Sequence, residues 1–234
     1  MSDYVSLGIV LLSGLLVASL QLPLGTFLLL FHSSMSKNIP KKTKTLASSF
    51  ISGATIMFFF LLCSACFLIS AISFSGTLSI GSLLVILGIL IALAIISFLF
   101  YYRRKGSTEL WLPRKVSRFI NSRAKHTSDN SEAFSLGLFV VFAEQIFTLP
   151  LVILSANEIL KLDKVYQTVA IVIFTLLSVL PLLIMRFIIR KGKNLADIQR
   201  WRLKYKNFFR LFSGSGYLIL AIFLFAFQIL GVNL

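Results

Sequence analysis

Long apolar runs alternate with basic, polar stretches along the whole chain. The apolar runs cover six stretches, residues 5–31, 46–74, 80–102, 134–159, 165–189 and 208–230. Each run is at or above the roughly 20 residues that an α-helix needs to cross the apolar part of a bilayer. The pattern predicts an all-α, polytopic membrane protein with six transmembrane helices.

The composition agrees with this pattern and excludes a soluble domain. Of the 234 residues, 57% are hydrophobic and 13% are charged, and the mean hydropathy is +0.92. Such values are typical of a chain that lies largely in lipid. The N-terminus holds Asp3 but no Lys or Arg before the first apolar run, which argues against a cleaved signal peptide with a basic leading region.

Lys and Arg are unevenly distributed over the connections between the runs. Of the 23 residues of this kind, all but Lys161 and Lys164 lie in or beside the first, third and fifth connections. Basic connections stay in the cytoplasm, so we predict a cell (inner) membrane protein with both termini and the fourth connection outside. This topology accounts for the net charge of +15 without a nucleic-acid partner, and the same cations could contact anionic membrane lipids.

The six runs form two groups of three around a basic centre. Residues 1–102 are predicted to form a first three-helix repeat and residues 133–234 a second, joined by a basic cytoplasmic linker over 103–132. Leu-Pro-Leu occurs in the first run of each group, around Pro23 and, 127 positions later, around Pro150. Three spans per group give the groups opposite orientations, which is the 3+3 inverted repeat of many secondary transporters. Chance recurrence in a leucine-rich chain is the alternative.

The linker allows two interpretations. Its apolar residues between Trp111 and Ile120 recur at helical spacing beside basic ones, a pattern typical of a short helix at the membrane surface. A solvated connection between the two halves is the alternative.

Glu144 is the one carboxylate near the middle of the fourth run. A charge at the bilayer centre costs about 2.5–3.5 kcal/mol on insertion scales, so such residues usually face a protein interior or a wet cavity. Burial favours the neutral carboxyl, which could then take up and release a proton near neutral pH. We predict that Glu144 couples proton movement to transport; a structural carboxyl paired with Gln21 or Arg186 is the alternative.

Three uncharged polar residues, Gln21, Gln145 and Thr148, lie at comparable depth in the first and fourth runs. With Glu144 they could line a substrate or proton pathway, or they could simply join helices by hydrogen bonds. The cluster predicts a polar site between the first and fourth helices.

The same two helices contain residues that disturb helical structure, namely Pro23, Gly25 and Pro150. We predict helix breaks at these positions, because broken helices open backbone groups toward the substrate in many transporters. Simple packing kinks are the alternative.

Cys63 and Cys66 are three residues apart and share one face of the second helix. No neighbour in the sequence would stabilise a thiolate, so a structural role is predicted, and two soft ligands alone make a poor metal site. The loops contain no phosphate-binding glycine loop, nucleophile elbow or zinc spacing. Neither enzymatic activity nor a cofactor is therefore predicted.

Several motifs follow one another in a recognisable order. They are Leu22-Pro23-Leu24-Gly25, the basic linker, Ser135-Leu-Gly137-Leu-Phe before the proline-bearing fourth helix, and Trp201 before Arg210-Leu-Phe-Ser-Gly-Ser-Gly216-Tyr-Leu-Ile. In these features the chain resembles the LysE superfamily of bacterial membrane exporters, nearest its peptidoglycolipid-addressing (GAP) branch and more distantly the CcdA/DsbD thiol carriers. The resemblance implies a six-helix, three-plus-three fold and an export role.

The chain also departs from these relatives. It has Leu149-Pro150 where the LysE superfamily commonly has Asn-Pro, which argues against amino-acid export, and it has leucines where the thiol carriers hold cysteines beside the prolines.

These observations together predict an inner-membrane secondary transporter that exports a small solute or a lipid-linked molecule, coupled to protons through Glu144. A membrane thiol-disulfide electron carrier using Cys63 and Cys66 and a non-transporting membrane scaffold are the alternatives. The sequence allows an oligomer without specifying one.

Overall fold

The computed structural model describes residues 3–20, 25–28, 30, 40–73, 77–99, 114–190, 200 and 204–229, which form helices and short turns without any strand. The helices are α1 (Asp3–Ser19), α3 (Pro40–Ile72), α4 (Ile80–Leu99), α5 (Arg114–His126), α6 (Asn130–Ala143), α7 (Gln145–Leu160), α8 (Lys164–Arg190), α10 (Lys206–Phe223) and the π-helix η1 (Leu224–Ile229). The predicted all-α fold is confirmed for this part of the chain.

Four of the helical segments are long and apolar enough to cross a membrane. They are Lys44–Ile72, Ile80–Phe98, Lys164–Ile188 and Asn207–Ile229. Helices α6 and α7 qualify only as a pair, bent by 78° where they meet, and α1 is shorter, with 17 residues. The described chain is therefore a multi-pass membrane protein with four spans, or five if the bent pair crosses as one, whereas the sequence predicted six. The predicted first run continues past residue 20 into a stretch mostly outside the described residues.

Large apolar side chains cover the outside of the bundle. Phe60 and Phe67 of α3 are 60% and 70% exposed, Val85 of α4 is 62% exposed and Ile222 of α10 is 63% exposed. A continuous apolar surface of this kind is rare on a soluble monomer. Lipid tails are as apolar as leucine side chains. Such a surface is therefore expected of helices that lie in a membrane.

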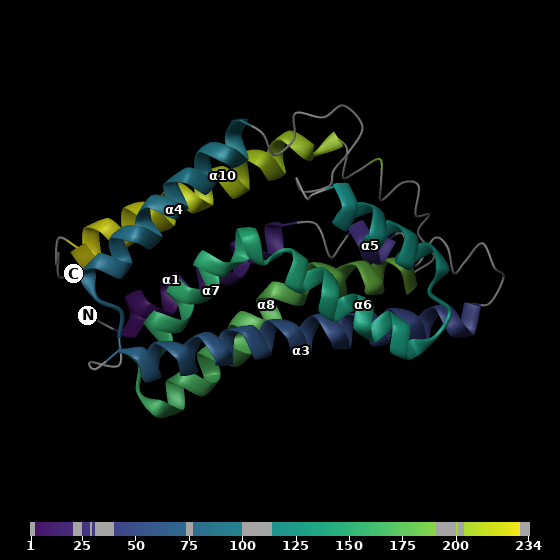
Figure 1. The fold of residues 1–234 in the computed structure, drawn as a ribbon, viewed down its shortest axis with the longest axis horizontal. Coiled ribbons are helices and arrows are strands. Elements are labelled where there is room, and N and C mark those ends of the chain that lie inside the picture. Colours follow the sequence, from purple (N-terminus) through teal and green to yellow (C-terminus); the bar gives the residue numbers. More distant parts are fainter. Residues whose placement is uncertain are drawn as a thin grey trace.

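Helices α1 and α7 lie in the middle of the bundle (Figure 1). Helix α1 packs against α7, α8 and α10, and α7 also contacts α3 and α4. Helix α3 packs against α6 and α8 on one side of this centre, and α4 pairs with α10 on the other. The arrangement surrounds α7, which begins immediately after Glu144, with helices from both halves of the chain.

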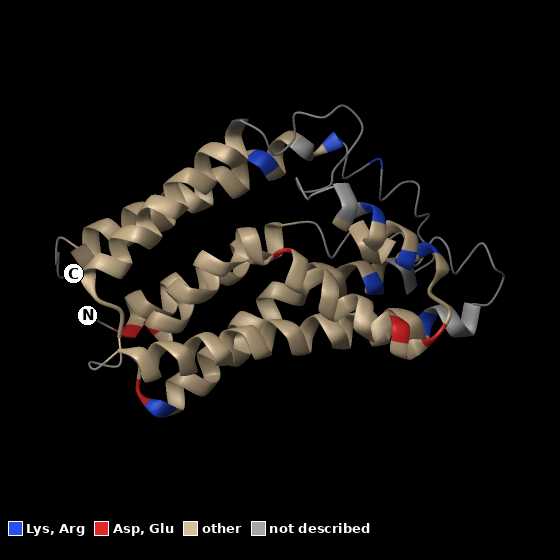
Figure 2. Ribbon diagram, in the orientation of Figure 1, with Lys and Arg blue, Asp and Glu red and all other residues tan. Residues whose placement is uncertain are grey.

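The described basic residues gather at one end of the bundle. Figure 2 shows Lys and Arg around α5 and around the starts of α3 and α10. At the opposite end α1 begins and η1 finishes, and there the turn between α7 and α8 holds Lys161 and Lys164. The described basic residues of α5 and of the starts of α3 and α10 therefore share one end of the bundle.

Part of the predicted linker is helical. Helix α5 covers residues 114–126 of the predicted linker and buries Ile120 and Ala124. Its Phe119 contacts Phe139 of α6, with the ring centroids 5.3 Å apart. The helix of the first interpretation is confirmed for residues 114–126, and its location at the membrane surface stays a prediction. Residues 103–113 lie outside the described residues.

Helices α3 and α6 touch backbone to backbone at two glycines. A Cβ atom on Gly53 would lie 2.2 Å from the carbonyl oxygen of Phe134, and one on Gly137 would lie 2.2 Å from the carbonyl oxygen of Phe50. Real Cβ atoms do not approach backbone this closely, so only glycine permits the contact. Small residues allow this close approach between helices in lipid, where hydrophobicity alone does not hold helices together.

We expect Gly137→Ala to separate α3 from α6 and to lower the free energy of unfolding by about 1–3 kcal/mol, the usual cost of overpacking. Gly88→Ala in α4 is the matched control, because a Cβ there meets nothing within 4 Å. Thermal unfolding of the purified protein in detergent measures both variants. Equal midpoints for the two variants would contradict the backbone contact.

Candidate functional site

The bent pair α6 and α7 is interrupted at a single residue, Glu144. Its backbone has φ −78° and ψ −9°. Its N–H donates to the carbonyl oxygens of Val140 (3.1 Å) and Val141 (3.2 Å), and its carbonyl oxygen accepts the N–H groups of Phe147 (2.9 Å) and Thr148 (3.2 Å). The chain therefore changes direction by 78° while the backbone groups of the pivot residue stay hydrogen-bonded. In lipid, the backbone groups at a helix break require hydrogen-bond partners of this kind.

The side chain of Glu144 is fully buried at this pivot, with 0% exposure. Glu144 caps the C-terminal end of α6 and also precedes the first residue of α7, so the opposed ends of two helix dipoles meet at this residue. Tyr217 of α10 donates its hydroxyl to the carbonyl oxygen of Phe147 at 3.1 Å and interacts electrostatically with Glu144. The site thus combines a buried carboxyl group with a nearby buried phenol.

The structure brings three of the predicted site residues together. Thr148 is fully buried one turn after Glu144 and donates its hydroxyl to the Glu144 carbonyl at 3.4 Å. Gln145 is half-buried and donates its side-chain amide to the Val141 carbonyl at 3.3 Å. The fourth, Gln21, lies outside the described residues, and Arg186, considered as a partner for Glu144, is exposed on α8.

The predicted helix breaks need one correction. Pro150 lies inside α7, and the break comes six residues earlier, at Glu144. Proline removes one i→i−4 hydrogen bond, here the bond to Ile146, but the helix continues when its neighbours support it. Gly25 is in helical conformation and half-buried, and Pro23 lies outside the described residues.

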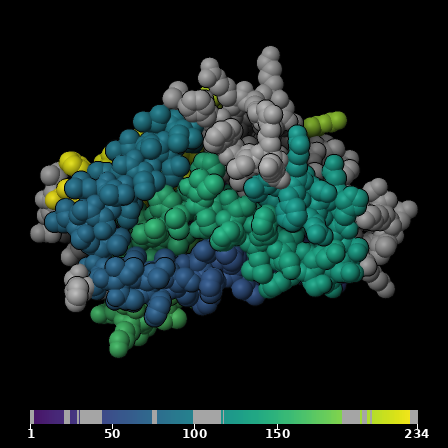
Figure 3. All heavy atoms as spheres, in the orientation of Figure 1, coloured from purple at the N-terminus to yellow at the C-terminus, as the bar shows by residue number. Residues whose placement is uncertain are grey.

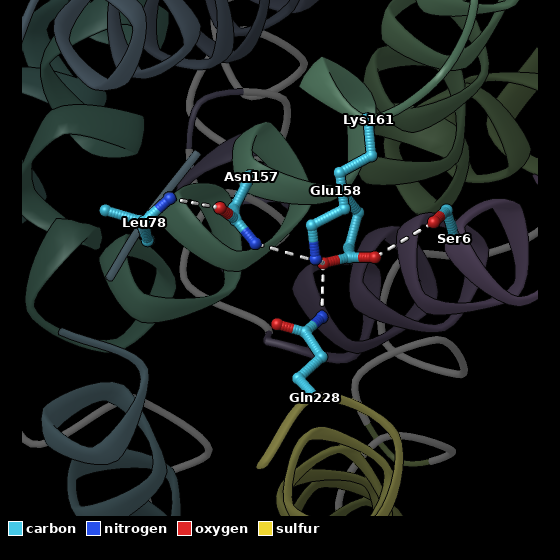
Figure 4. Close-up of polar contacts among 6 residues, drawn as sticks. All are labelled: Ser6, Leu78, Asn157, Glu158, Lys161 and Gln228. Atoms are coloured by element: carbon cyan, nitrogen blue, oxygen red, sulfur yellow. Dashed lines mark hydrogen bonds and ion pairs between the residues drawn. The ribbon is translucent and has the colours of Figure 1, made fainter. Parts of the chain in front are cut away.

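A second buried carboxylate lies at the opposite end of α7 (Figure 4). Glu158 has 0% exposure, and its Oε1 accepts hydrogen bonds from Lys161 Nζ (2.6 Å), Asn157 Nδ2 (3.1 Å) and Gln228 Nε2. Its Oε2 accepts the hydroxyl of Ser6 at 3.0 Å. The carboxylate therefore joins α1, α7 and η1.

Asn157 extends this group to the connection before α4. It is fully buried, and its Oδ1 accepts the backbone N–H of Leu78 at 2.8 Å. Glu158 lies at the end of the fourth apolar run, and α7 continues to Leu160, so the carboxylate belongs to the last turn of the helix. The i,i+3 spacing of Glu158 and Lys161 at the end of an apolar run was the available signal of a helical ion pair.

Cys63 and Cys66 are free thiols on α3, both partly buried. The sulfur of Cys66 lies 4.0 Å from the carbonyl oxygen of Ala156 in α7. Among the described residues, no group of three or more His, Cys, Asp or Glu could hold a metal ion.

A cavity of about 650 Å³ lies beside α7, between α3 and α4. Its wall includes Leu149 and Ile153 of α7 and hydroxyl groups such as those of Ser64 and Ser82. Figure 3 shows α7 at the molecular surface between α4 and α3. The cavity is thus reached from the side of the bundle.

Comparison of the chain with protein-family models, with curated proteins and with solved structures found no match. The fold and the site define the class of the protein as a helical, multi-pass membrane protein with a broken helix pair at its centre.

We expect Asn157→Leu to lower the free energy of unfolding by about 1–3 kcal/mol, because the Leu78 N–H loses its partner and a buried unpaired donor carries such a cost. Asn130→Leu, at an exposed asparagine on α6, is the control. Thermal unfolding in detergent compares the two variants with wild type. If Asn157→Leu matches the control, the polar group does not hold the helices together.

Proposed function

We propose that this chain is an inner-membrane secondary transporter that exports a small solute or a lipid-linked molecule and uses Glu144 to couple export to proton entry. The observation that carries the proposal is a fully buried carboxylate at a 78° break between two apolar helices. Buried acids in apolar spans are costly, and they typically mark proton relays and substrate pathways. Transporter sites are commonly built where such broken helices meet.

The packing of the helices supports an inverted repeat as part of this proposal. Helix α3 of the first half packs against α6 of the second, and α8 of the second half packs against α1 of the first. The second helix of each half therefore packs against the first helix of the other half. A two-fold axis in the membrane plane, as in inverted-repeat transporters, produces this exchange.

Individual contacts repeat with nearly constant spacing. A Cβ atom on Gly137 would meet the backbone of Phe50, and one on Gly14, 123 positions before Gly137, would lie 3.6 Å from Cα of Phe174, which follows Phe50 by 124 positions. The helix ends follow the same spacing, since α1 ends at Ser19 and α6 at Ala143. With a spacing of 124 positions Glu144 corresponds to Leu20, and only the second half contributes an acid. These contacts follow a shorter spacing than the 127 positions that separate the two Leu-Pro-Leu motifs.

In the proposed cycle, Glu144 changes its charge as the centre opens to one side and then to the other. The neutral carboxyl is favoured while the site is closed, because a dry interior penalises the charge. When the site opens inward the proton leaves to the cytoplasm, and the carboxylate can then be reprotonated from outside. The 78° pivot gives α7 a defined point of rotation for this change.

The cavity beside α7 supports an amphiphilic cargo within this proposal. Its wall includes Leu149, the residue after Thr148, and it combines apolar side chains with several hydroxyl groups. An acyl or isoprenoid tail suits such a lateral cavity, while a polar head could reach the buried groups of α7. The same geometry also admits a small apolar solute.

We expect Glu144→Gln to abolish export, because the amide keeps the size of the side chain but cannot exchange a proton. The measurement compares metabolites and lipids inside and outside cells that express each variant at matched membrane levels. Glu132→Gln, at an exposed acid of α6, is the control and should export like wild type.

The double variant Cys63→Ala with Cys66→Ala tests the electron-carrier alternative in the same assay. A transporter should tolerate it, whereas a thiol-disulfide carrier requires both cysteines. If wild type and all variants give the same profiles, transport is rejected. The non-transporting membrane scaffold is then the remaining interpretation.

The proposed orientation places the basic end in the cytoplasm and the turn between α7 and α8 outside. In the cysteine-free background, we expect Asp163→Cys to react with a membrane-impermeant thiol reagent on intact cells, and Ser128→Cys to react only after the cells are opened. Both positions are exposed and lie at opposite ends of the bundle. The reverse pattern would overturn the orientation.

A further inference from the structure

Buried polar side chains form a column between the two carboxylates of α7. They come from α1, α7 and α10, three helices that meet at the centre of the bundle. Besides Glu144 and Glu158, the members are Ser6, Ser13, Ser19, Thr148, Ser155, Ser213 and Tyr217, each at most 6% exposed. We call the contact between these helices the seam. Buried polar groups are costly in an apolar bundle, so a row of them along the seam requires an explanation.

The helical spacing places these groups in order. Thr148 and Ser155 are seven residues apart on α7, as are Ser6 and Ser13 on α1, so each pair lies on one face of its helix. The two helices run antiparallel, because Ser6 near the start of α1 contacts Glu158 near the end of α7. Their hydroxyl groups therefore face the same seam.

The depth of each group follows from the rise of an α-helix. Counted inward from the Ser6–Glu158 contact at about 1.5 Å per residue, Ser155 lies at about 4.5 Å, Ser13 at about 10.5 Å, Thr148 at about 15 Å and Glu144 at about 21 Å. Successive groups therefore differ in depth along the helix axes by about 4.5–6 Å. The column thus reaches from the outer end of the bundle to the pivot.

Two contacts from other helices confirm the position of the inner half. The hydroxyls of Ser19 on α1 and Ser213 on α10 lie 3.0 Å apart, and Tyr217 donates to the Phe147 carbonyl. In contrast, the hydroxyl oxygens of Ser13 and Ser155 are buried and have no hydrogen-bond partner among the described residues. Two unsatisfied hydroxyls on the same seam are costly unless something else binds there.

We propose that this column carries protons between the outer surface and Glu144, with the Glu158 cluster as its outer entrance. The inference rests on the proposed function, in which Glu144 exchanges protons. Each hydroxyl group accepts a proton from one neighbour and passes its own proton to the next. Every hydroxyl group is therefore neutral again after a transfer. Lys161 is 25% exposed while its partner Glu158 is fully buried, which links the entrance to the surface.

The charged and titratable groups around the column are few. Lys161 faces Glu158, Tyr217 faces Glu144, and Arg210 lies two turns before Tyr217 on α10. Cys66 of α3 lies against α7 at Ala156. The nearby α8, which packs on α1 and α7, has Lys164, Tyr166 and Arg186 exposed.

The test follows the protonation of Glu144 itself and needs no substrate. Wild-type protein is reconstituted into phosphatidylethanolamine–phosphatidylglycerol vesicles, the external pH is stepped, and infrared difference spectroscopy records the carboxyl C=O band that Glu144→Gln removes. We expect Ser13→Ala combined with Ser155→Ala to slow this band by about tenfold or more, since one positioned proton-transfer group is typically worth about a hundredfold or more.

Ser97→Ala is the matched control, because Ser97 of α4 is also buried with an unpartnered hydroxyl but lies on the α4–α10 pair. It should leave the band at the wild-type rate. Ser155→Thr keeps the hydroxyl, so Ser13→Ala combined with Ser155→Thr should respond faster than Ser13→Ala combined with Ser155→Ala. Thermal unfolding checks that all variants remain folded.

The possible results separate this inference from the proposed function. If the double variant responds as fast as wild type while Glu144→Gln abolishes export, the column only packs helices and the transporter proposal stands. If wild type shows no band that depends on both pH and Glu144, proton coupling fails and the column fails with it.

Discussion

Helix α7 carries a carboxylate at each end, Glu144 directly before its first residue and Glu158 in its last turn, and both are fully buried. Most of the helix between them is buried as well. A buried acid has to be hydrogen-bonded, paired or protonated, because an uncompensated charge in an apolar medium is very costly. For Glu158 the surrounding helices supply these partners, which tie α7 to α1 and η1.

The surroundings of the two buried carboxylates, Glu144 and Glu158, differ. At Glu158 the positive charge of Lys161 and donors from Ser6, Asn157 and Gln228 satisfy the carboxylate directly. The C-terminal end of a helix disfavours an anion, so this pairing is needed. At Glu144 the C-terminal end of α6 meets the start of α7, so the two helix dipoles oppose each other, and Tyr217 lies nearby. Glu158 is held by an ion pair and further donors, whereas Glu144 lies between two helix ends.

Much of the fold follows from local patterns in the sequence. The apolar runs predict α3, α4, α8 and α10 closely, because length and hydropathy decide whether a segment crosses lipid. Glu144 and Thr148 were predicted as one site because they are polar residues at comparable depth in an apolar run, and the structure places both at the pivot. The exact break was missed because proline marks only where a hydrogen bond is lost, and the surrounding helices decide where the chain bends.

The outer cluster could not be predicted in the same way. Glu158 has its serine partner 152 positions away, in α1. Hydropathy places Glu158 at the very end of the fourth apolar run, where charged residues commonly face solvent, and gives no sign of a partner in the first run. Only the packing of α1, α7 and η1 shows that this acid lies inside the bundle.

The backbone contacts of α3 and α6 at Gly53 and Gly137 have a consequence for how the protein is made. Helix α3 leaves the ribosome long before α6, so Gly53 has no partner helix until the second half of the chain begins to emerge. The first half therefore cannot complete its own packing, and the two halves have to assemble together.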